Sequence, residues 1–444
     1  GTGGGRDLLA GIAFRQPRGL GLEINPLMRR TVEEKYGDYT GHPYTHPGVE
    51  VVVDEARSHL TSLDEKFDIL QLSLIDTFSL NASGGFVFSE NYLYTTEGFE
   101  EYYEHLSDDG VLSLTRYFVG GYPLEILRLA TMARDAWERE GVADFASHVV
   151  VMRQDVNATM LVKKSAWTPA EVAKLGELAT SLNAGLLYAP GLAGADADVS
   201  AVVASADWRS FVASYPFEID PPVDDRPFFF NFLRKLTPEP PGDGFHFVKT
   251  WNDALVLMYM LISVVTAIAL AFFLLPLGLF ATQRSHRVGA AVAAPLLLYF
   301  ACLGYGFLMI EIPLLQHFVL FLGYPVYALA VVLFSLLVAS GVGSALSPVV
   351  ARTARRTAAV AVAVAAVMAL YQWGLQAVFE ATLRRPFEVR VAISVALLAL
   401  PGVLMGMPFP AGLSRGPEEG DGGRWVSRAW VLNGWASVLG SVGA

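Results

Sequence analysis

The stretch that decides the fold opens the chain, where Gly1-Thr2-Gly3-Gly4-Gly5-Arg6-Asp7 is followed by an apolar run and then by Gly21-Leu22-Glu23. Glycine has no Cβ, so a turn built from it lets the backbone approach a ligand closely. Residues 8–14 have the apolar spacing of a helix, and residues 19–24 predict a strand that ends on an acid. Turn, helix, strand and strand-end acid in this order are typical of a nucleoside-binding βαβ unit, in which the acid binds ribose hydroxyls. A flexible glycine-rich terminus is the alternative.

A glycine turn of this kind follows a central strand of the sheet. We therefore expect the sequence to be a fragment of a longer protein, with an apolar strand of about five residues immediately before Gly1.

Charge and hydropathy divide the chain into two unlike halves. Of its 444 residues 53% are hydrophobic, and the mean hydropathy is +0.41, which is unusual for a soluble protein. The formal net charge is −11, and residues 251–444 hold 11 Arg against 7 Asp and Glu, which leaves −15 for residues 1–250. An acidic half has no basic surface for nucleic acid, so we expect no nucleic-acid partner.

The second half has the pattern of a membrane domain, because long stretches lack Asp, Glu, Lys and Arg, and about 20 apolar residues span a bilayer as a helix. The arginines between these stretches do not favour a cytoplasmic first half. We nevertheless place that half in the cytoplasm and the spans in a bacterial inner membrane, because nucleoside cofactors are cytoplasmic. Five full spans are predicted, over residues 254–280, 290–312, 325–347, 357–379 and 390–410. A truncated sixth span begins near Trp430.

The first half alternates strands and helices, which predicts an α/β Rossmann-like fold with a doubly wound parallel sheet. Predicted strands cover residues 19–24, 49–53, 67–72 and 111–115, and two further strands are predicted at 149–153 and 159–162. Ligands in such sheets bind beyond the carboxyl ends of the strands. Five polar residues fall at such ends and form the candidate site: Glu23, Asp54, Glu55, Ser73 and Asp76.

The predicted domains are residues 1–213, a linker over 214–250 and a transmembrane helix bundle over 251–444. The linker contains Asp224-Asp225-Arg226-Pro227 and then Phe228-Phe229-Phe230. An aromatic run before a membrane span suits the bilayer interface, and the alternative is a linker whose aromatic residues serve packing.

Several motifs together resemble the spermidine synthase family in its bacterial membrane-fused form, although the strand-end motifs alone are shared with many S-adenosylmethionine methyltransferases. The resemblance covers most of residues 1–240 and, more loosely, the membrane half. The residues that carry it are Gly3-Gly4-Gly5, Glu23, Asp54-Glu55-Ala56, Phe67-Asp68 through Asp76, Phe88-Ser89-Glu90-Asn91-Tyr92, the Asp-Asp-Arg-Pro-Phe-Phe-Phe stretch, Gly306 through Glu311, and Leu432-Asn433-Gly434-Trp435.

The resemblance implies a site for S-adenosylmethionine or its decarboxylated form, without a metal. The turn of Gly1, Gly3, Gly4 and Gly5 would face the amino-acid or aminopropyl tail, and Glu23 would bind the ribose hydroxyls. Glu55, with Asp54 beside it, would accept from the adenine amino group.

The soluble synthases of this family have an Asp-x-x-Asp strand end, whose first acid is the presumed base for the attacking amine. Here that position is Ser73, and Asp76 is the second acid. We expect Asp76 and Ser73 to be the catalytic positions, with aminopropyl transfer weakened by the serine.

Two functions follow. The first is a membrane-anchored transferase with a small amine or a membrane-proximal substrate as acceptor. The alternative is a membrane transporter or scaffold whose Rossmann domain senses a nucleoside without turnover. Expected partners are the lipid bilayer, a small-molecule nucleoside donor and an unidentified acceptor, and a homo-oligomer is left open.

Glu311 is a further candidate, since it lies between Ile310 and Ile312 in a predicted span, with Gln316 and His317 within two turns. Ionisable residues at membrane depth are costly and usually functional. The alternative is a position near the headgroups, if Pro313 ends the span.

Overall fold

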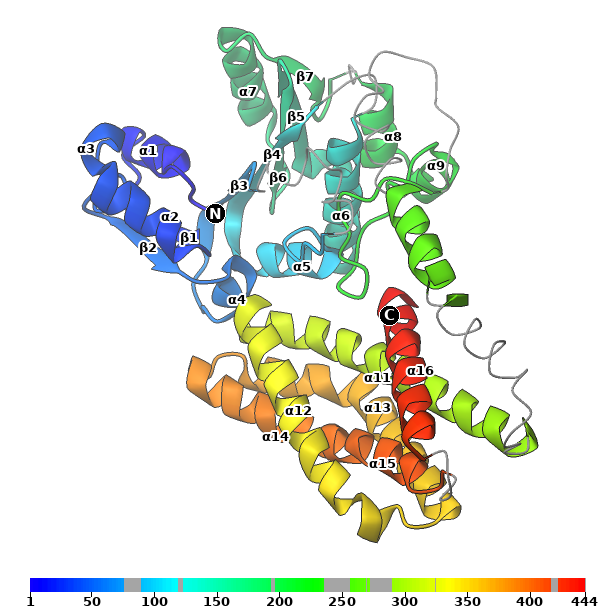
Figure 1. The fold of residues 1–444 in the computed structure, drawn as a ribbon. Coiled ribbons are helices and arrows are strands. Elements are labelled where there is room, and N and C mark those ends of the chain that lie inside the picture. The colour runs from blue at the N-terminus through cyan, green and yellow to red at the C-terminus, as the bar shows by residue number, and fades with distance from the viewer. Residues whose placement is uncertain are drawn as a thin grey trace. The chain divides into compact units, whose positions relative to one another are not determined.

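The computed structural model describes residues 1–75, 89–118, 123–192, 196–234, 256–268, 270–271, 290–323, 325–416 and 422–443. The chain divides into two compact units, Gly1–Tyr259 and Met260–Ala444 (Figure 1). The first is a mixed α/β unit with a Rossmann-like alternation of strands and helices, and the elements described in the second are all helices.

The first unit begins with a two-stranded parallel sheet that carries the glycine turn. β1 (Gly19–Glu23) pairs with β2 (Val49–Val53) in a register that sets Glu23 opposite Val53, so the two carboxyl ends meet. The predicted helix over residues 8–14 is present as α1 (Arg6–Ala13). The connection from β1 to β2 consists of α2 (Pro26–Arg30), a π-helical turn over Thr31–Lys35, and α3 (Gly37–Thr40).

A five-stranded sheet forms the rest of the unit, in the order β3-β4-β6-β5-β7. β3 and β4 are parallel, as predicted for the strands up to residue 115, and the remaining neighbours are antiparallel, so the sheet is mixed rather than parallel throughout. The reason is a two-residue connection, Asp155-Val156, between β5 and β6, with Asp155 at φ 52. So short a link can only join antiparallel strands. The strands are β3 (Phe67–Ser73), β4 (Leu106–Tyr117), β5 (Val149–Gln154), β6 (Asn157–Lys163) and β7 (Gly185–Tyr188).

Helices cover both faces of this sheet, with α7 on one side and α6 and α8 on the other (Figure 1). Alternate residues of β5 show the division, because Val149 and Val151 belong to the main core whereas Val150 packs with Val172 of α7. A helix-covered sheet of this kind agrees with the predicted α/β fold class. The helices are α4 (Ala56–Thr61), α5 (Thr96–His105), α6 (Leu124–Arg139), α7 (Pro169–Ser181), α8 (Ala197–Ala204) and α9 (Trp208–Ser214), with a 3₁₀ turn over Phe145–His148.

The aromatic run after Pro227 belongs to this core, so its predicted place at the bilayer interface is wrong. Phe229 and Phe232 are fully buried in the main hydrophobic cluster. The buried guanidinium of Arg128 in α6 donates to the backbone carbonyls of Phe229 (2.7 Å) and Asn231 (2.8 Å). Residues 228–232, in the segment predicted as a linker, therefore supply part of the core of the first unit.

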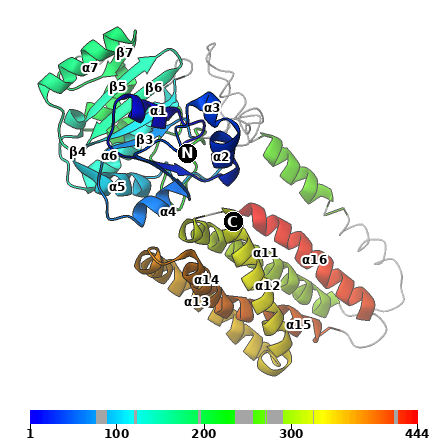
Figure 2. The same ribbon diagram turned by 90° about the vertical axis from the view of Figure 1, so that its left-hand side faces the viewer.

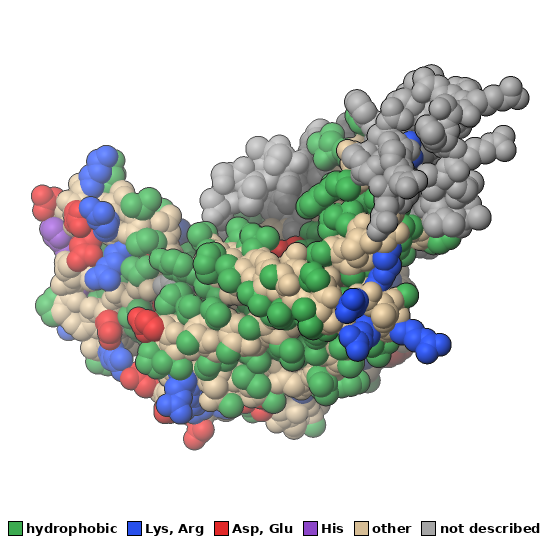
Figure 3. All heavy atoms as spheres, turned by 60° about the horizontal axis from the view of Figure 1, so that its bottom comes forward, with side chains coloured by type: hydrophobic (Ala, Val, Ile, Leu, Met, Phe, Trp, Pro, Cys, Tyr) green, Lys and Arg blue, Asp and Glu red, His purple; other side chains and the backbone are tan. Residues whose placement is uncertain are grey.

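Among the residues that the structure describes, the second unit contains four helices that are long and apolar enough to cross a membrane. These helices are Leu298–Leu322, Val326–Val350, Ala354–Thr382 and Phe387–Leu413. Figure 3 shows hydrophobic side chains gathered over this unit, as lipid-facing helices require. The elements are α11 (Ala290–Leu322), α12 (Pro325–Val350), α13 (Ala354–Thr382), α14 (Phe387–Gly406), α15 (Pro408–Leu413) and α16 (Gly422–Gly443).

The predicted spans differ from these helices in their bounds and in their number. Of the first, 254–280, the described part includes a shorter apolar helix over Val256–Ile268, and residues 272–280 lie outside the described residues. The second runs ten residues beyond its predicted end, because α11 continues through Pro313 to Leu322. The expected sixth span coincides with α16, which is not among the four.

Glycines allow the helices of two pairs to approach closely, α11 with α16 and α12 with α14. Figure 2 shows α11 and α16 side by side. A Cβ on Gly304 would collide with the carbonyl of Asn433, and one on Gly343 would collide with the carbonyl of Val403. Gly306 and Gly341 face open space. Of these four glycines, Gly304 and Gly343 therefore lie at close helix contacts.

Replacing Gly343 by alanine should lower the thermal midpoint of the helical unit in detergent, because α12 and α14 must move apart at the Val403 carbonyl. The expected cost is about 1–3 kcal/mol, typical of overpacking. Gly341→Ala is the control on the same helix and should be neutral or slightly stabilising, because alanine is the better helix former. Equal midpoints for the two variants would show that the contact does not constrain the pair.

Candidate functional site

The glycine turn folds back onto the carboxylate of Glu23. Glu23 is buried at the end of β1, where Oε2 accepts from the amide of Gly3 (3.0 Å) and the hydroxyl of Thr2 (3.4 Å). Its other oxygen, Oε1, accepts from the amide of Asn25 (3.0 Å). The Tyr44 hydroxyl lies 2.6 Å from the Thr2 hydroxyl and donates to the Gly3 carbonyl (2.7 Å). These contacts bring together the glycine turn and the strand-end acid Glu23, the two features from which the sequence predicts a nucleoside site.

The glycines of the turn have different surroundings. Gly3, at φ 51, and Gly4 have nothing within 4 Å of an added Cβ, so this side of the turn is open to a ligand. Gly5 is buried at φ 84, and a Cβ there would lie 2.6 Å from Pro43 Cγ. Gly1 is exposed, and a Cβ added there would lie 3.6 Å from Glu23 Oε2. Gly5 is therefore required for packing and backbone conformation, and Gly3 and Gly4 are the positions open to a ligand.

Asp54 and Glu55 follow β2 directly and lie beside Glu23, since the Asp54 amide donates to the Glu23 carbonyl (3.2 Å). Asp54 Oδ2 lies 2.9 Å from His59 Nδ1. Glu55 caps α4, because its two carboxylate oxygens accept from the amides of Arg57 (3.1 Å) and Ser58 (2.7 Å). Each oxygen of an ionised carboxylate can accept a second bond, so the cap leaves Glu55 able to accept from a ligand.

Ser73 is the last residue of β3, at the carboxyl end of the strand, and it lies opposite Thr115 of β4. Its hydroxyl accepts from Gln71 Nε2 (3.0 Å). The next residue, Leu74, has φ 48, a left-handed conformation that is costly for a side chain of this size and that clusters at functional turns. Asp76, the predicted partner of Ser73, lies outside the described residues.

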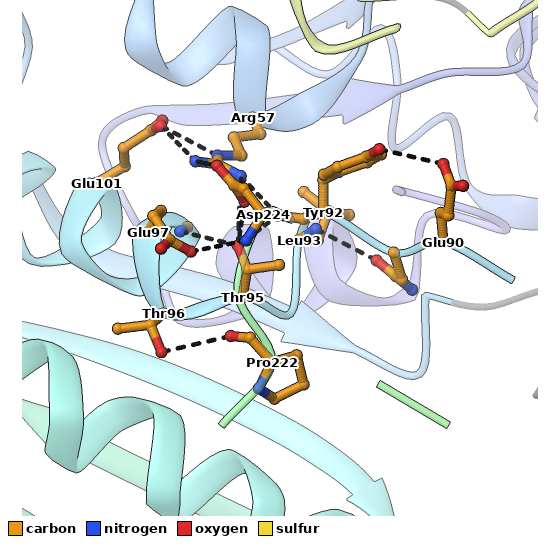
Figure 4. Close-up of polar contacts among 12 residues, drawn as sticks. Arg57, Glu90, Tyr92, Leu93, Thr95, Thr96, Glu97, Glu101, Pro222 and Asp224 are labelled. Carbon is orange, nitrogen blue, oxygen red and sulfur yellow. Dashed lines mark hydrogen bonds and ion pairs between the residues drawn. The ribbon is translucent and has the colours of Figure 1, made fainter. Parts of the chain in front are cut away.

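A buried ion-pair cluster beneath these strand ends was not predicted (Figure 4). Arg57 of α4 donates to both carboxylate oxygens of Asp224 (2.6 and 2.9 Å) and through Nε to Glu101 of α5 (3.0 Å). It also donates to the Tyr92 carbonyl (3.2 Å) and the Thr95 hydroxyl (3.3 Å). The cluster therefore connects α4 to α5 and to the segment around Asp224, which lies 167 positions further along the chain.

The charges of this cluster depend on one another. Burial lowers the pKa of Arg57, but Glu101 and Asp224 outweigh burial and leave that pKa raised. Burial raises the pKa of Glu101 despite the opposing charge of Arg57. Burial and then the charge of Asp224 raise the pKa of Glu97, which accepts from the Asp224 amide (3.0 Å).

Tyr92 extends the cluster toward Glu90, to which its hydroxyl donates (3.1 Å). Burial and then Glu90 raise the pKa of Tyr92, so its hydroxyl stays protonated. Both residues come from the Phe88-Ser89-Glu90-Asn91-Tyr92 stretch, which sequence analysis singled out only as part of a resemblance. The ion pairs of Arg57 with Glu101 and Asp224 join residues far apart in the sequence, so no local sequence pattern predicts them. Arg57 follows Glu55 by two residues, and the sequence does not indicate that it pairs with Asp224 or Glu101.

The edge fits a nucleoside on chemical grounds. Carboxylates that accept but do not donate suit ribose hydroxyls and an adenine amino group, and the open side of Gly3 and Gly4 leaves room for a polar tail. Within the described residues no three His, Cys, Asp or Glu side chains gather as a metal site would require.

Comparisons with known proteins give matches among solved structures. No protein-family model and no curated protein matches the chain. Similar structures include spermidine synthase from Thermotoga maritima (15% identity, TM-score 0.28, 39% of this chain and 56% of that one) and a probable spermidine synthase from Corynebacterium glutamicum (16%, 0.31, 42% and 63%). A third is a spermidine synthase in complex with the transition-state analogue AdoDATO (16%, 0.27, 39% and 56%). The matched region thus spans 56–63% of the length of these chains.

Removing the cation of the cluster tests its structural role. Arg57→Met leaves the carboxylates of Asp224 and Glu101 without their counter-charge and should lower the stability of the first unit by about 3 kcal/mol. Arg18→Met removes an exposed pair with Glu65 and should cost less than about 1 kcal/mol. Urea unfolding in detergent, followed by tryptophan fluorescence, compares the two. A loss no larger for Arg57→Met than for Arg18→Met would contradict this role.

Proposed function

We propose that this chain is a membrane-anchored transferase that uses S-adenosylmethionine or its decarboxylated form as donor. The acceptor is a small amine or a membrane-proximal substrate. The observation that carries the proposal is the buried carboxylate of Glu23, which binds the Gly3 amide and adjoins Asp54 at the carboxyl ends of two paired parallel strands.

Each part of the donor has a matching group at this edge. Glu23 accepts from ribose hydroxyls in place of its contact with Thr2, and Glu55, with Asp54 beside it, accepts from the adenine amino group. The turn at Gly3 and Gly4 faces the tail that carries the sulfonium. When bound, the sulfonium supplies an electrophilic carbon, and the protein contributes chiefly by positioning the acceptor in line with it.

The end of β3 supplies the acceptor side. An amine must lose a proton to attack, and a serine hydroxyl is a poor base without a histidine partner. The described contact of the Ser73 hydroxyl is with Gln71. Asp76 is therefore the group assigned to draw or relay the proton of the acceptor, and Ser73 reduces the rate of aminopropyl transfer.

Membrane anchoring rests on the four long apolar helices. We place them in a bacterial inner membrane and the first unit in the cytoplasm, where nucleoside donors are found.

A second function is favoured by Ser73 itself. A transporter or scaffold whose Rossmann-like unit senses a nucleoside needs the Glu23 edge but no base at the end of β3. Binding without product formation is the result that this alternative predicts.

Replacing Glu23 by alanine should weaken binding of S-adenosylmethionine or its decarboxylated form by about 1–3 kcal/mol, the scale of a lost charge-assisted hydrogen bond. Glu50→Ala is the matched control, because Glu50 lies on β2 of the same sheet with an exposed side chain. Isothermal titration calorimetry in detergent measures both. Unchanged affinity in Glu23→Ala would remove this residue from the site.

Turnover tests the acceptor side separately. Wild-type protein should transfer the aminopropyl group to putrescine weakly or not at all, and Ser73→Asp should raise that activity by restoring a base. Asp76→Asn should abolish the remaining turnover and leave nucleoside binding nearly unchanged. Labelled product formation is the measurement. Robust spermidine synthesis by the wild type would show that the base lies elsewhere, and bound donor with no product in any variant would favour the sensor.

A further inference from the structure

Acids and arginines are distributed unevenly over the helical unit. From residue 290 onward, the acids among the described residues are Glu311, Glu380 and Glu388. The last two lie near the α13–α14 connection, where exposed Arg384 and Arg385 are also found. Glu311 lies inside α11, which continues past Pro313, so the alternative that this proline ends the span near the headgroups is wrong. The opposite end of α13 therefore carries arginines without a described acid close to them in the chain.

An arginine cluster lies where α12 passes into α13, and we call it the α12–α13 arginine cluster. Its members are Arg352, Arg355, Arg356 and Arg415. The first three lie in the connection and the first turn of α13, with exposed side chains. Arg415 follows α15, and its Nη2 donates to the Ala351 carbonyl (2.9 Å) and to the Thr357 hydroxyl (2.6 Å). Ala351 directly precedes Arg352 and Thr357 directly follows Arg356, so all four arginines lie at the same turn of the chain.

The α12–α13 arginine cluster has no described counter-charge. In the part of the chain that the structure describes, no carboxylate pairs with any of its four guanidinium groups. Arg415 uses Nη2 for its two bonds, which leaves Nε and Nη1 able to donate to a ligand. The four positive charges repel one another, and the amino end of α13 adds the positive end of its helix dipole. An anion bound among them would lower this electrostatic energy.

The cluster borders the apolar surface of the spans. Leu346 and Val349, in the last turns of α12, are 42% and 70% exposed. The guanidinium of Arg356 lies 3.5 Å from the Val349 carbonyl, so the positive charge begins where the exposed apolar surface ends. Figure 3 shows Lys and Arg side chains gathered at one edge of the hydrophobic surface. A ligand with an anionic group next to hydrocarbon chains matches this succession of surfaces.

We propose that the α12–α13 arginine cluster binds the headgroup phosphate of an anionic phospholipid whose acyl chains lie against the end of α12. Arginine suits a phosphate because its planar guanidinium donates two parallel hydrogen bonds. Basic clusters directly beside a membrane span attract anionic lipids. A zwitterionic lipid fits less well, because its ammonium group brings a further positive charge to the cluster. This proposal is independent of transferase activity.

Native mass spectrometry of the 444-residue chain in detergent measures lipid binding directly. The chain is titrated with phosphatidylglycerol and, separately, with phosphatidylcholine that carries the same acyl chains. Phosphatidylglycerol should bind about tenfold more tightly, because each arginine near an anionic lipid contributes about fivefold to affinity. The difference between the two lipids should shrink as the ionic strength of the solution is raised, because salt screens exposed charges.

A matched pair of double variants locates the binding position. Arg352→Gln with Arg355→Gln removes two exposed arginines of the cluster and should weaken phosphatidylglycerol binding by about 25-fold, at about fivefold for each arginine. Arg384→Gln with Arg385→Gln removes two exposed arginines at the opposite end of α13 and should change the dissociation constant by less than about twofold. Thermal unfolding followed by circular dichroism verifies that both variants are folded.

Three results would overturn the proposal. Displacement of phosphatidylglycerol by inorganic phosphate would assign the cluster to a soluble anion, because a bound lipid also buries its acyl chains. Equal affinity of the wild type for the two lipids would show that the arginines are already neutralised, as pairing with Glu418, Glu419 and Asp421, which lie outside the described residues, would do. Equal weakening by the two double variants would show that net charge, and not this cluster, attracts the lipid.

Discussion

The ion pairs of Arg57 hold the candidate site together. In the described residues, the two-stranded sheet that carries Glu23 and Asp54 shares no strand pairing with the five-stranded sheet that carries Ser73. Arg57 follows the Asp54-Glu55 pair by two residues and reaches α5 through Glu101 and the distant segment through Asp224. Because the guanidinium is buried and fully engaged, small shifts of α4 would leave charges unpaired. The relative position of the two sheets, and so of the strand ends at Glu23 and Ser73, depends on this residue.

The sequence predicted those parts of the fold that local patterns encode. The glycine turn, β1 and β2 follow from apolar periodicity and β-branched residues, and the acids that end these strands meet as parallel pairing requires. The antiparallel part of the sheet was missed because predicted strands at 149–153 and 159–162 left too long a gap to show a hairpin. Both strands extend further, and their two-residue turn, Asp155-Val156, lacks the glycine that usually marks such a turn. The aromatic run was misplaced for a similar reason, since only tertiary contacts with Arg128 show that it is core.

For the site, residue types were easier to predict than their partners. The turn glycines and strand-end acids could be named from spacing, but their division of labour could not, because the packing of Gly5 against Pro43 and the capping of α4 by Glu55 depend on the folded chain. The cluster of Arg57, Asp224 and Glu101 joins segments far apart in sequence. Glu311 was visible as an unusual residue, but the continuation of its helix through Pro313 to Leu322 required the structure.

The proposed transferase requires that the edge formed by the glycine turn, Glu23 and Asp54 binds the donor nucleoside. Hydrogen–deuterium exchange of the chain in detergent, with and without saturating S-adenosylmethionine, tests it most directly. We expect slower exchange of the backbone amides of residues 1–5 and 54–58, with unchanged exchange in the β5–β6 hairpin. Saturation with donor that leaves the amides of residues 1–5 unprotected, or that protects only residues away from this edge, would contradict it.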